Sequence, residues 1–186
     1  MKIGFALCGS FCTYEKVFPV MEELAKEHEI IPIVSDAACR TDSRFGTAED
    51  HLQRLRTICD REPLTDITQV EPIGPKKLLD VLVIAPCTGN TLAKLAHGIA
   101  DGPVTMAAKS HLRNGRPVVV GISTNDALAG AAENIGKLLG KKHYYFVPFR
   151  QDDPVQKPTS MVADFTYLPQ AIEAAAQGKQ VQPILL

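Results

Sequence analysis

Five short apolar runs follow one another along the chain, with room for a helix between most of them. The runs are continuous rather than alternating: Ile3–Leu7, Ile30–Val34, Val81–Ala85, Val118–Ile122 and Tyr144–Val147. Continuous hydrophobicity is typical of strands that are covered on both faces, as in parallel sheets. Apolar residues at helical spacing follow the first run (Val17, Met21, Leu24) and the third (Leu92, Leu95, Ile99). The pattern therefore predicts an α/β, doubly wound, three-layer sandwich with a mainly parallel sheet.

Two stretches interrupt this pattern, Thr41–Lys77 and Pro148–Pro158. The first is expected to hold a helix around Glu49–Cys59. The second carries three prolines and several charges, so we expect an exposed loop that starts on the ligand-binding edge of the sheet and acts as a lid or partner-docking segment. The alternative is a solvated connection to a final helix near Tyr167–Ala176. Neither stretch resembles a linker, and residues 1–186 are expected to form a single domain.

Charge and composition narrow the possible partners. The chain has 20 Lys and Arg against 21 Asp and Glu, so no strongly basic face for nucleic acid is expected. The first apolar run is too short for a secretion signal or a membrane span, which predicts a cytoplasmic protein with no membrane partner. The five cysteines and five histidines show no metal-ligand spacing, so we expect buried free thiols and no metal. Cys87 in particular is interpreted as a small packing residue.

Small polar residues follow four of the runs, where the carboxyl ends of parallel strands would meet and bind ligands. They are Gly9-Ser10, Ser35-Asp36, Thr88-Gly89-Asn90-Thr91 and Ser123-Thr124-Asn125-Asp126, and Pro86 is expected to end the third strand. Each group alone could merely cap a helix. Together they favour a phosphate-bearing ligand, and because neither a Gly-x-Gly-x-x-Gly nor a nucleoside-triphosphate loop is present, a mononucleotide fits best.

The segment Ala85–Asp101 resembles the Pro-Ala-Ser-Ala-Asn-Thr segment and following helix of the flavoprotein family of cysteine decarboxylases, and Gly9-Ser10 through Tyr14 is similar to that family's first turn. This resemblance implies a Rossmann-like or flavodoxin-like fold that holds FMN at its strand ends. Gly9, Ser10 and Ser35 would lie near the phosphate or ribose. Thr88, Asn90 and Thr91 would lie near the rest of the cofactor.

Other stretches are similar to one group within that family. Each member of this group is one subunit of a two-protein oxidoreductase. That enzyme forms dipicolinate, the pyridine dicarboxylate of bacterial spores, from a dihydrodipicolinate-type intermediate of lysine synthesis. The stretches include Pro72–Lys76, Asn114–Leu128, Gln151–Pro154 and Gln182–Leu185. The resemblance implies a partner A subunit that holds NADP, a small dicarboxylate substrate, and a homo-oligomer that is a trimer or a multiple of a trimer.

The chain departs from the decarboxylases at two points. Ser123-Thr124-Asn125 replaces the Pro-x-Met-Asn segment that binds their cysteine substrate, and neither His51 nor His97 lies in the expected motif of their base. An FMN-dependent decarboxylase of a small thiol, or a non-catalytic subunit that stabilises its partner, remain alternatives, and the catalytic residues stay unknown. A dicarboxylate calls for cations, and Arg44 is preferred over the other candidates, which are Lys76, Lys77, Lys109 and Arg116.

Overall fold

The structure, a computed structural model, describes all residues, 1–186. Its centre is a seven-stranded sheet in the order β2-β1-β3-β4-β7-β6, with β5 paired to β4. The first five strands are mutually parallel and coincide with the five predicted runs: β1 (Lys2–Leu7), β2 (Glu29–Val34), β3 (Val81–Cys87), β4 (Val118–Thr124) and β5 (Tyr144–Phe146). The predicted α/β fold with a mainly parallel sheet is confirmed.

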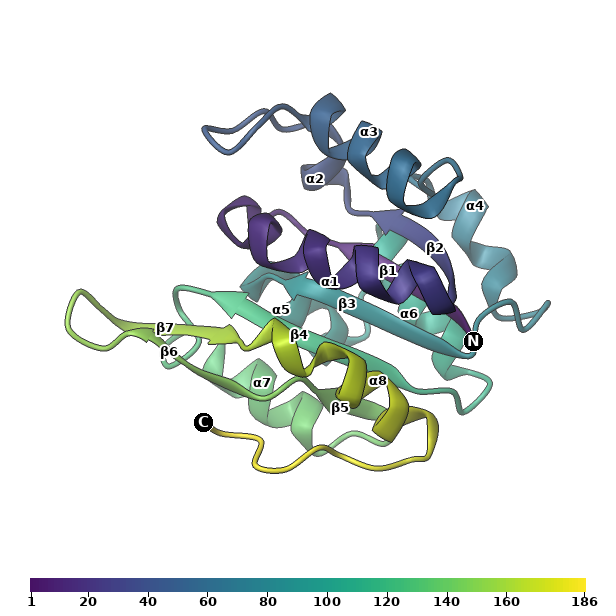
Figure 1. Cartoon of the computed structure of the whole chain (residues 1–186). Helices are drawn as coiled ribbons and strands as arrows, with labels where there is room; N and C mark the ends of the chain where they lie inside the picture. Colours follow the sequence, from purple (N-terminus) through teal and green to yellow (C-terminus); the bar gives the residue numbers. More distant parts are fainter.

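Helices cover both faces of the sheet. Figure 1 shows α1 (Tyr14–Glu27) and α8 (Leu168–Ala176) in front, and α5 (Gly89–His97), α6 (Pro103–Leu112) and α7 (Ala132–Leu139) behind. The short helices α2 (Asp36–Arg40) and α4 (Ile67–Val70) and the longer α3 (Ala48–Cys59) lie beyond β2. Single 3-10 turns occur at η1 (Phe11–Thr13), η2 (Glu71–Ile73) and η3 (Phe165–Tyr167). None of the helices is long and apolar enough to cross a membrane.

The helix predicted around Glu49–Cys59 is α3. Its start is encoded locally, because Thr47 accepts a hydrogen bond from the Asp50 backbone and the Asp50 carboxylate accepts one from the Thr47 backbone. This reciprocal capping satisfies two N–H groups that a helix leaves without partners. The cap allows a helix of low hydrophobicity to form outside the main sandwich.

The expectation of an irregular loop over Pro148–Pro158 is wrong, because the chain forms an antiparallel hairpin there. Strand β6 (Phe149–Asp153) pairs with β7 (Lys157–Ala163), and β7 pairs with β4 at Ser123 and Thr124. The hairpin projects from the body of the molecule (Figure 1). Backbone pairing stabilises such an arm without a continuous apolar run. Its prolines are tolerated because Pro148 precedes β6, Pro154 lies in the turn and Pro158 lies near the exposed start of β7.

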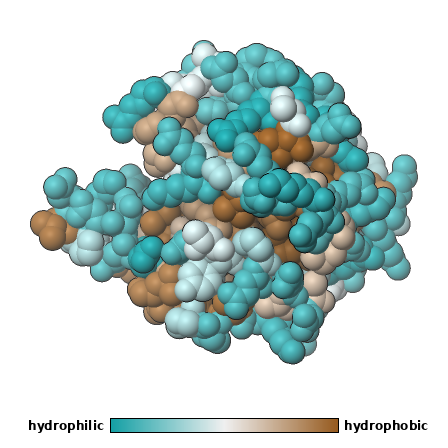
Figure 2. Space-filling view, viewed as in Figure 1, coloured by the Kyte–Doolittle hydropathy of each residue, from teal (hydrophilic) through white to brown (hydrophobic).

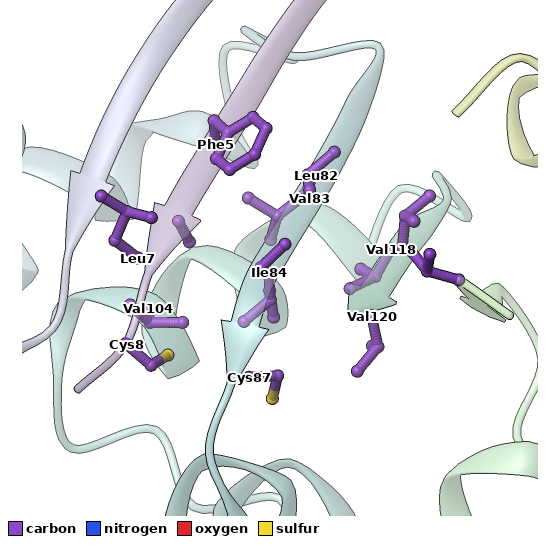
Figure 3. Packing of buried hydrophobic residues seen from close by; sticks show 14 of the residues in the cluster. Phe5, Leu7, Cys8, Leu82, Val83, Ile84, Cys87, Val104, Val118 and Val120 are labelled. Carbon is purple, nitrogen blue, oxygen red and sulfur yellow. The ribbon is translucent and has the colours of Figure 1, made fainter. Parts of the chain in front are cut away.

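The core is one cluster of 49 buried residues around β1, β3 and β4. Figure 3 shows Phe5, Val83 and Val120 within it, with Cys8 and Cys87 near the carboxyl ends of β1 and β3. The sequence predicted that Pro86 ends strand β3, and this prediction is wrong. The strand continues to Cys87 with a shift of register against β4 after Ile84, and this shift accommodates the missing proline N–H.

All five cysteines are free, but the expectation that they are buried is correct for only two of them. Cys8 and Cys87 are buried, Cys39 and Cys59 are half-buried, and Cys12 is exposed. Cys12 is the exposed residue of the turn η1, and the hydrophobicity of the sequence did not reveal this exposure.

Candidate functional site

A crevice of about 900 Å³ opens where β1, β3 and β4 end. It is bordered by the loops after these strands and, from the other side, by the β6–β7 hairpin and the loop around Ser43–Phe45. In the view of Figure 1 this is the left side, and Figure 2 shows the surface hollowed there above the projecting hairpin. The crevice therefore lies at the edge that the strand-end pattern predicted.

A smaller cavity of about 300 Å³ adjoins the crevice beside the starts of α2 and α6. Gly9, Thr88 and Asn90 border both spaces, Ser10 borders only the crevice, and Ser35 and Thr91 border only the smaller cavity. The structure thus brings all of the sequence-predicted site residues to two adjoining compartments.

The turn after β1 is held by hydrogen bonds on both sides of Ser10. The Ser10 and Ser123 hydroxyls lie 2.8 Å apart, and Thr13 donates to the Ser10 carbonyl at 2.7 Å. The Tyr14 hydroxyl donates to the Cys8 carbonyl at 2.9 Å, and burial raises the pKa of Tyr14, so that it remains a neutral donor. Since one serine hydroxyl donates to the other, the second retains a free proton for a ligand.

The hydroxyls of Thr88 and Thr91 point into the protein rather than toward a ligand. Thr88 Oγ1 caps α5 by accepting from the Thr91 backbone, and the two hydroxyls lie 3.1 Å apart. Thr91 Oγ1 donates onward to the Cys8 sulfur at 3.3 Å, so the Thr88 proton is directed to Thr91. Burial raises the pKa of the neighbouring Cys87 thiol. These linked hydrogen bonds make the floor of the site rigid, and the two threonine hydroxyls have no proton left for a ligand.

Ser35 and Asn90 also keep polar groups that are available to a ligand. Ser35 Oγ accepts from the Ala38 backbone at 3.3 Å, which leaves its own O–H free to donate. Asn90 is exposed at the start of α5 and its amide makes no hydrogen bond within the chain. The first N–H groups of α5, at Gly89 and Asn90, also lack partners inside the helix. Together they form a set of donors suited to an anionic or polar ligand.

Asp126 is a crevice residue whose role the sequence did not single out. Its carboxylate accepts a hydrogen bond from Thr124 and borders the crevice. A Cβ on Gly89 would lie 2.8 Å from both Asp126 Oδ1 and Thr124 Oγ1. Glycine at this position therefore allows a carboxylate to approach the N-terminus of α5, where a helix favours negative charge.

The cations that border the crevice differ from those expected. Arg44 does not line it, although Ser43 and Phe45 do; its guanidinium lies 4.8 Å from the centre of the Phe45 ring. Lys16 and Lys157 line the crevice instead. Of the other expected cations, Lys109 lies at a different cavity, Arg116 donates to the Leu79 carbonyl, and Lys76 and Lys77 border none of the three cavities described here.

Lys16 and Lys157 differ in their surroundings. Lys157 pairs with Asp152 at 2.8 Å across the hairpin, whereas Lys16 forms no ion pair. Lys16 was missed because it lies in the exposed first turn of α1, where a lysine is most often solvated. Only the position of the hairpin opposite α1 makes Lys16 a crevice residue.

Neither histidine of interest borders the crevice. His51 packs against Phe11, Tyr14 and Phe18, with ring centres 4.8–6.2 Å away, and burial lowers its pKa. His97 is exposed at the last residue of α5. His51 therefore supports the aromatic wall behind Phe11, and no histidine is placed to exchange protons with a ligand in the crevice.

Comparison with known proteins gives concordant results. The flavoprotein family model matches residues 1–148. The B subunit of dipicolinate synthase from Bacillus subtilis (strain 168) is 49% identical over 186 residues, covering 100% of this chain and 93% of that protein. A flavin prenyltransferase UbiX of Thermoplasma acidophilum is 26% identical over 98 residues, 53% of each chain.

Solved structures show the same relationship. The crystal structure of the dipicolinate synthase B subunit from Bacillus halodurans C matches with a TM-score of 0.91 and 46% identity, covering 100% of this chain and 95% of that one. The FMN-dependent cysteine decarboxylase SpaF matches with a TM-score of 0.71 and 24% identity, covering 95% and 97%. The second likeness is one of fold alone.

Proposed function

Because this chain belongs to the flavoprotein family, we propose that it is the B subunit of a dipicolinate synthase. In this role it acts with an NADP-binding dipicolinate synthase A subunit in the cytoplasm of a sporulating cell. The two subunits form dipicolinate from a dihydrodipicolinate-type intermediate of the lysine pathway. The observation that carries the proposal is the 49% identity to a dipicolinate synthase B subunit, which extends over the whole chain.

FMN is the proposed cofactor, and the residues present fit it. The crevice and the adjoining cavity, about 900 and 300 Å³, have volumes usual for small-molecule sites, roughly 300–1,000 Å³. Two adjoining compartments suit a molecule with a flat ring at one end and a phosphate at the other. Two carboxylates border the smaller cavity, and nearby cations balance their negative charge. Asp101 pairs with Lys94 at 2.9 Å, and Asp36 lies 3.8 Å from Arg40.

We assign the phosphate or ribose to Gly9, Ser10 and Ser35. The flavin ring is assigned to the segment Thr88–Thr91. There Asn90 offers its amide, while Thr88 and Thr91 contribute a rigid surface rather than free hydroxyls. When bound, FMN supplies an acceptor for an electron pair.

Formation of the aromatic ring from a dihydro intermediate removes a proton and a hydride, and the bound flavin or the NADP of the A subunit would be the acceptor of the hydride. In this proposal Asp126, whose carboxylate has no cationic partner, accepts the proton. Lys16 holds a substrate carboxylate, because it is the crevice cation that is not already paired. The hairpin would then close the site through Asp152 and Lys157. A homo-oligomer, either a trimer or a multiple of a trimer, would bring a neighbouring chain to the open side of the site.

The test is to purify the protein, record its visible spectrum, and measure dipicolinate formation after mixing with the A subunit. We expect flavin absorption and activity that requires both proteins. Lys16→Met should raise KM for the intermediate at least about tenfold with unchanged flavin binding. Asp126→Asn should lower kcat with little change in KM. The control Lys26→Met removes an exposed lysine of the same helix that pairs with Glu23, and it should leave both parameters unchanged.

The same assay separates the rival functions. A decarboxylase would bind flavin and release carbon dioxide from a small thiol acid without forming dipicolinate. If the chain were a non-catalytic subunit, its double variant Lys16→Met, Asp126→Asn would still support full dipicolinate formation by the A subunit. Either result would refute the proposal.

A further inference from the structure

A third cavity, of about 500 Å³, is lined by residues of α5 and α6, two helices that lie behind the sheet in the view of Figure 1. Its third wall is the segment 141–144, which leads into β5. The apolar part of the lining includes the side chains of Leu95, Ile99 and Leu112. We call this space the α5–α6 cavity. It shares only Thr105 with the smaller polar cavity and no residue with the crevice.

Positive charge surrounds this apolar lining without any compensating carboxylate. Lys109, Lys141, Lys142 and His143 border the cavity, and no Asp or Glu does. Lys141 already has hydrogen-bond partners within the chain, because its ammonium donates to the carbonyls of Leu95 and Ala96 near the end of α5. Lys109 and Lys142 form neither an ion pair nor a side-chain hydrogen bond anywhere in the chain. Lys109 and Lys142 are therefore two unpaired cations at the rim of an apolar space.

The segment that carries His143 adopts an unusual backbone conformation. His143 has φ of 69°, in the left-handed region that residues with a Cβ rarely occupy, and such strain tends to be found where a side chain must be held in place. The next residue, Tyr144, is half-buried, and burial raises the pKa of Tyr144 to about 12. Its hydroxyl thus remains a donor at neutral pH.

We propose that the α5–α6 cavity binds a small organic anion with an apolar ring and one or two carboxylates. The ring contacts Leu95, Ile99 and Leu112, and the carboxylates face Lys109 and Lys142. The cavity volume of about 500 Å³ lies within the range of small-molecule sites. An inorganic anion would leave the apolar lining without a partner, and a neutral ring would leave the lysines without one. This inference does not depend on the proposed function.

The test is isothermal titration of the full-length protein with isophthalate, a benzene ring bearing two carboxylates. Inorganic phosphate and neutral benzamide serve as comparison ligands. The Lys109→Met, Lys142→Met double variant should weaken isophthalate binding at least about tenfold. Ile99→Asp, a change at an exposed position of the rim, should weaken it similarly. The control Lys76→Met, Lys179→Met changes two exposed lysines that border none of the three cavities, and it should leave binding unchanged. Lys16→Met in the crevice measures separately how much isophthalate binds there.

Three outcomes would overturn the proposal. Loss of isophthalate binding in Lys16→Met but not in Lys109→Met, Lys142→Met would place the ligand in the crevice. Phosphate binding as tight as isophthalate binding would remove the role of the apolar lining. A change of oligomeric state in Lys109→Met, Lys142→Met by light scattering, with no isophthalate binding to the unaltered protein, would make the cavity an interface between copies of this chain.

Discussion

The crevice at the strand ends and the α5–α6 cavity use different means to present polar groups. In the crevice, serine and threonine hydroxyls bond to one another and to the backbone, as at Ser10–Ser123 and Thr88–Thr91. In the α5–α6 cavity, Lys109 and Lys142 are long, exposed and unpaired above an apolar lining. The crevice is thus organised before a ligand arrives, whereas the cavity relies on charge attraction and apolar contact.

This difference follows from where the two sites lie. Parallel strands end together, so the short polar loops after them converge and can bond to one another. Helix flanks carry side chains that are farther apart and face water, and their charges remain free. A site of the first kind should be sensitive to single atoms of its hydrogen-bond network. A site of the second kind should be sensitive to charge and to the packing of its helices.

The largest expected effect concerns His111, which anchors α6, one of the two helices that border the α5–α6 cavity. It is buried, its Nε2–H donates to the Pro117 carbonyl at 3.1 Å, and burial lowers the pKa of His111 to about 4. As the pH falls, His111 of the unfolded chain therefore takes up a proton near pH 6.5, whereas His111 of the folded chain takes it up only near pH 4. The free energy of unfolding should fall by about 3 kcal/mol between pH 7 and 4 from this residue alone.

Urea unfolding across this pH range checks the effect of His111. In His111→Gln, whose amide can make the same bond, the decline with acid should be shallower by that amount. Parallel pH curves for the two proteins would show that His111 does not carry the acid sensitivity.

The next largest effect concerns Asn90 in the crevice. Asn90→Asp replaces a donor by a carboxylate beside the proposed flavin, and a lost hydrogen bond to a charged group costs about 1.5–3 kcal/mol. The affinity for FMN should fall roughly 10- to 100-fold, measured by calorimetric titration. Asn134→Asp on α7, which borders neither site, is the matched control. Equal affinities of the two variants would contradict the placement of the flavin ring.

A smaller effect is expected from the bond between Ser10 and Ser123, which joins the turn after β1 to the end of β4. A double-mutant cycle with Ser10→Ala and Ser123→Ala should give a coupling energy of about 0.5–1.5 kcal/mol in thermal or urea unfolding. If the crevice is organised in advance, FMN affinity should show coupling of the same sign. Additive effects in both measurements would mean that the 2.8 Å contact is incidental.

The smallest effect on stability is expected from Asp152 on the hairpin. Its pair with Lys157 is exposed, so Asp152→Ala should shift the melting temperature by less than about 2 °C while lowering dipicolinate formation several-fold. Asp153 is unsuitable for this test, because its carboxylate accepts from the backbone of Val155 and Gln156 and holds the turn. Glu23→Ala breaks a comparable exposed pair with Lys26 and should change neither quantity. Full activity of Asp152→Ala would refute a role of the hairpin in the reaction.

Much of the fold could be predicted from the sequence because its signals are local. A strand covered on both faces needs an unbroken apolar run, and all five such runs became parallel strands. The convergence of the small polar residues after them was also predictable, since Gly9, Ser10, Ser35, Thr88, Asn90 and Thr91 all border the adjoining compartments. The flavoprotein family was recognisable from the segment Ala85–Asp101, which is itself a strand end and the helix that follows.

The tertiary structure decided what depends on pairing and packing between distant segments. The hairpin over Phe149–Ala163 is stabilised by backbone pairing with β4, which leaves little trace in hydrophobicity. That pairing brings the hairpin to the crevice that Lys16 also borders, whereas Arg44 does not border it. The order of hydrogen bonds turns Thr88 and Thr91 inward, and the approach of α5, α6 and the segment before β5 creates the α5–α6 cavity. Residue types determine which bonds a side chain can form, but only its neighbours in space determine which of them it makes.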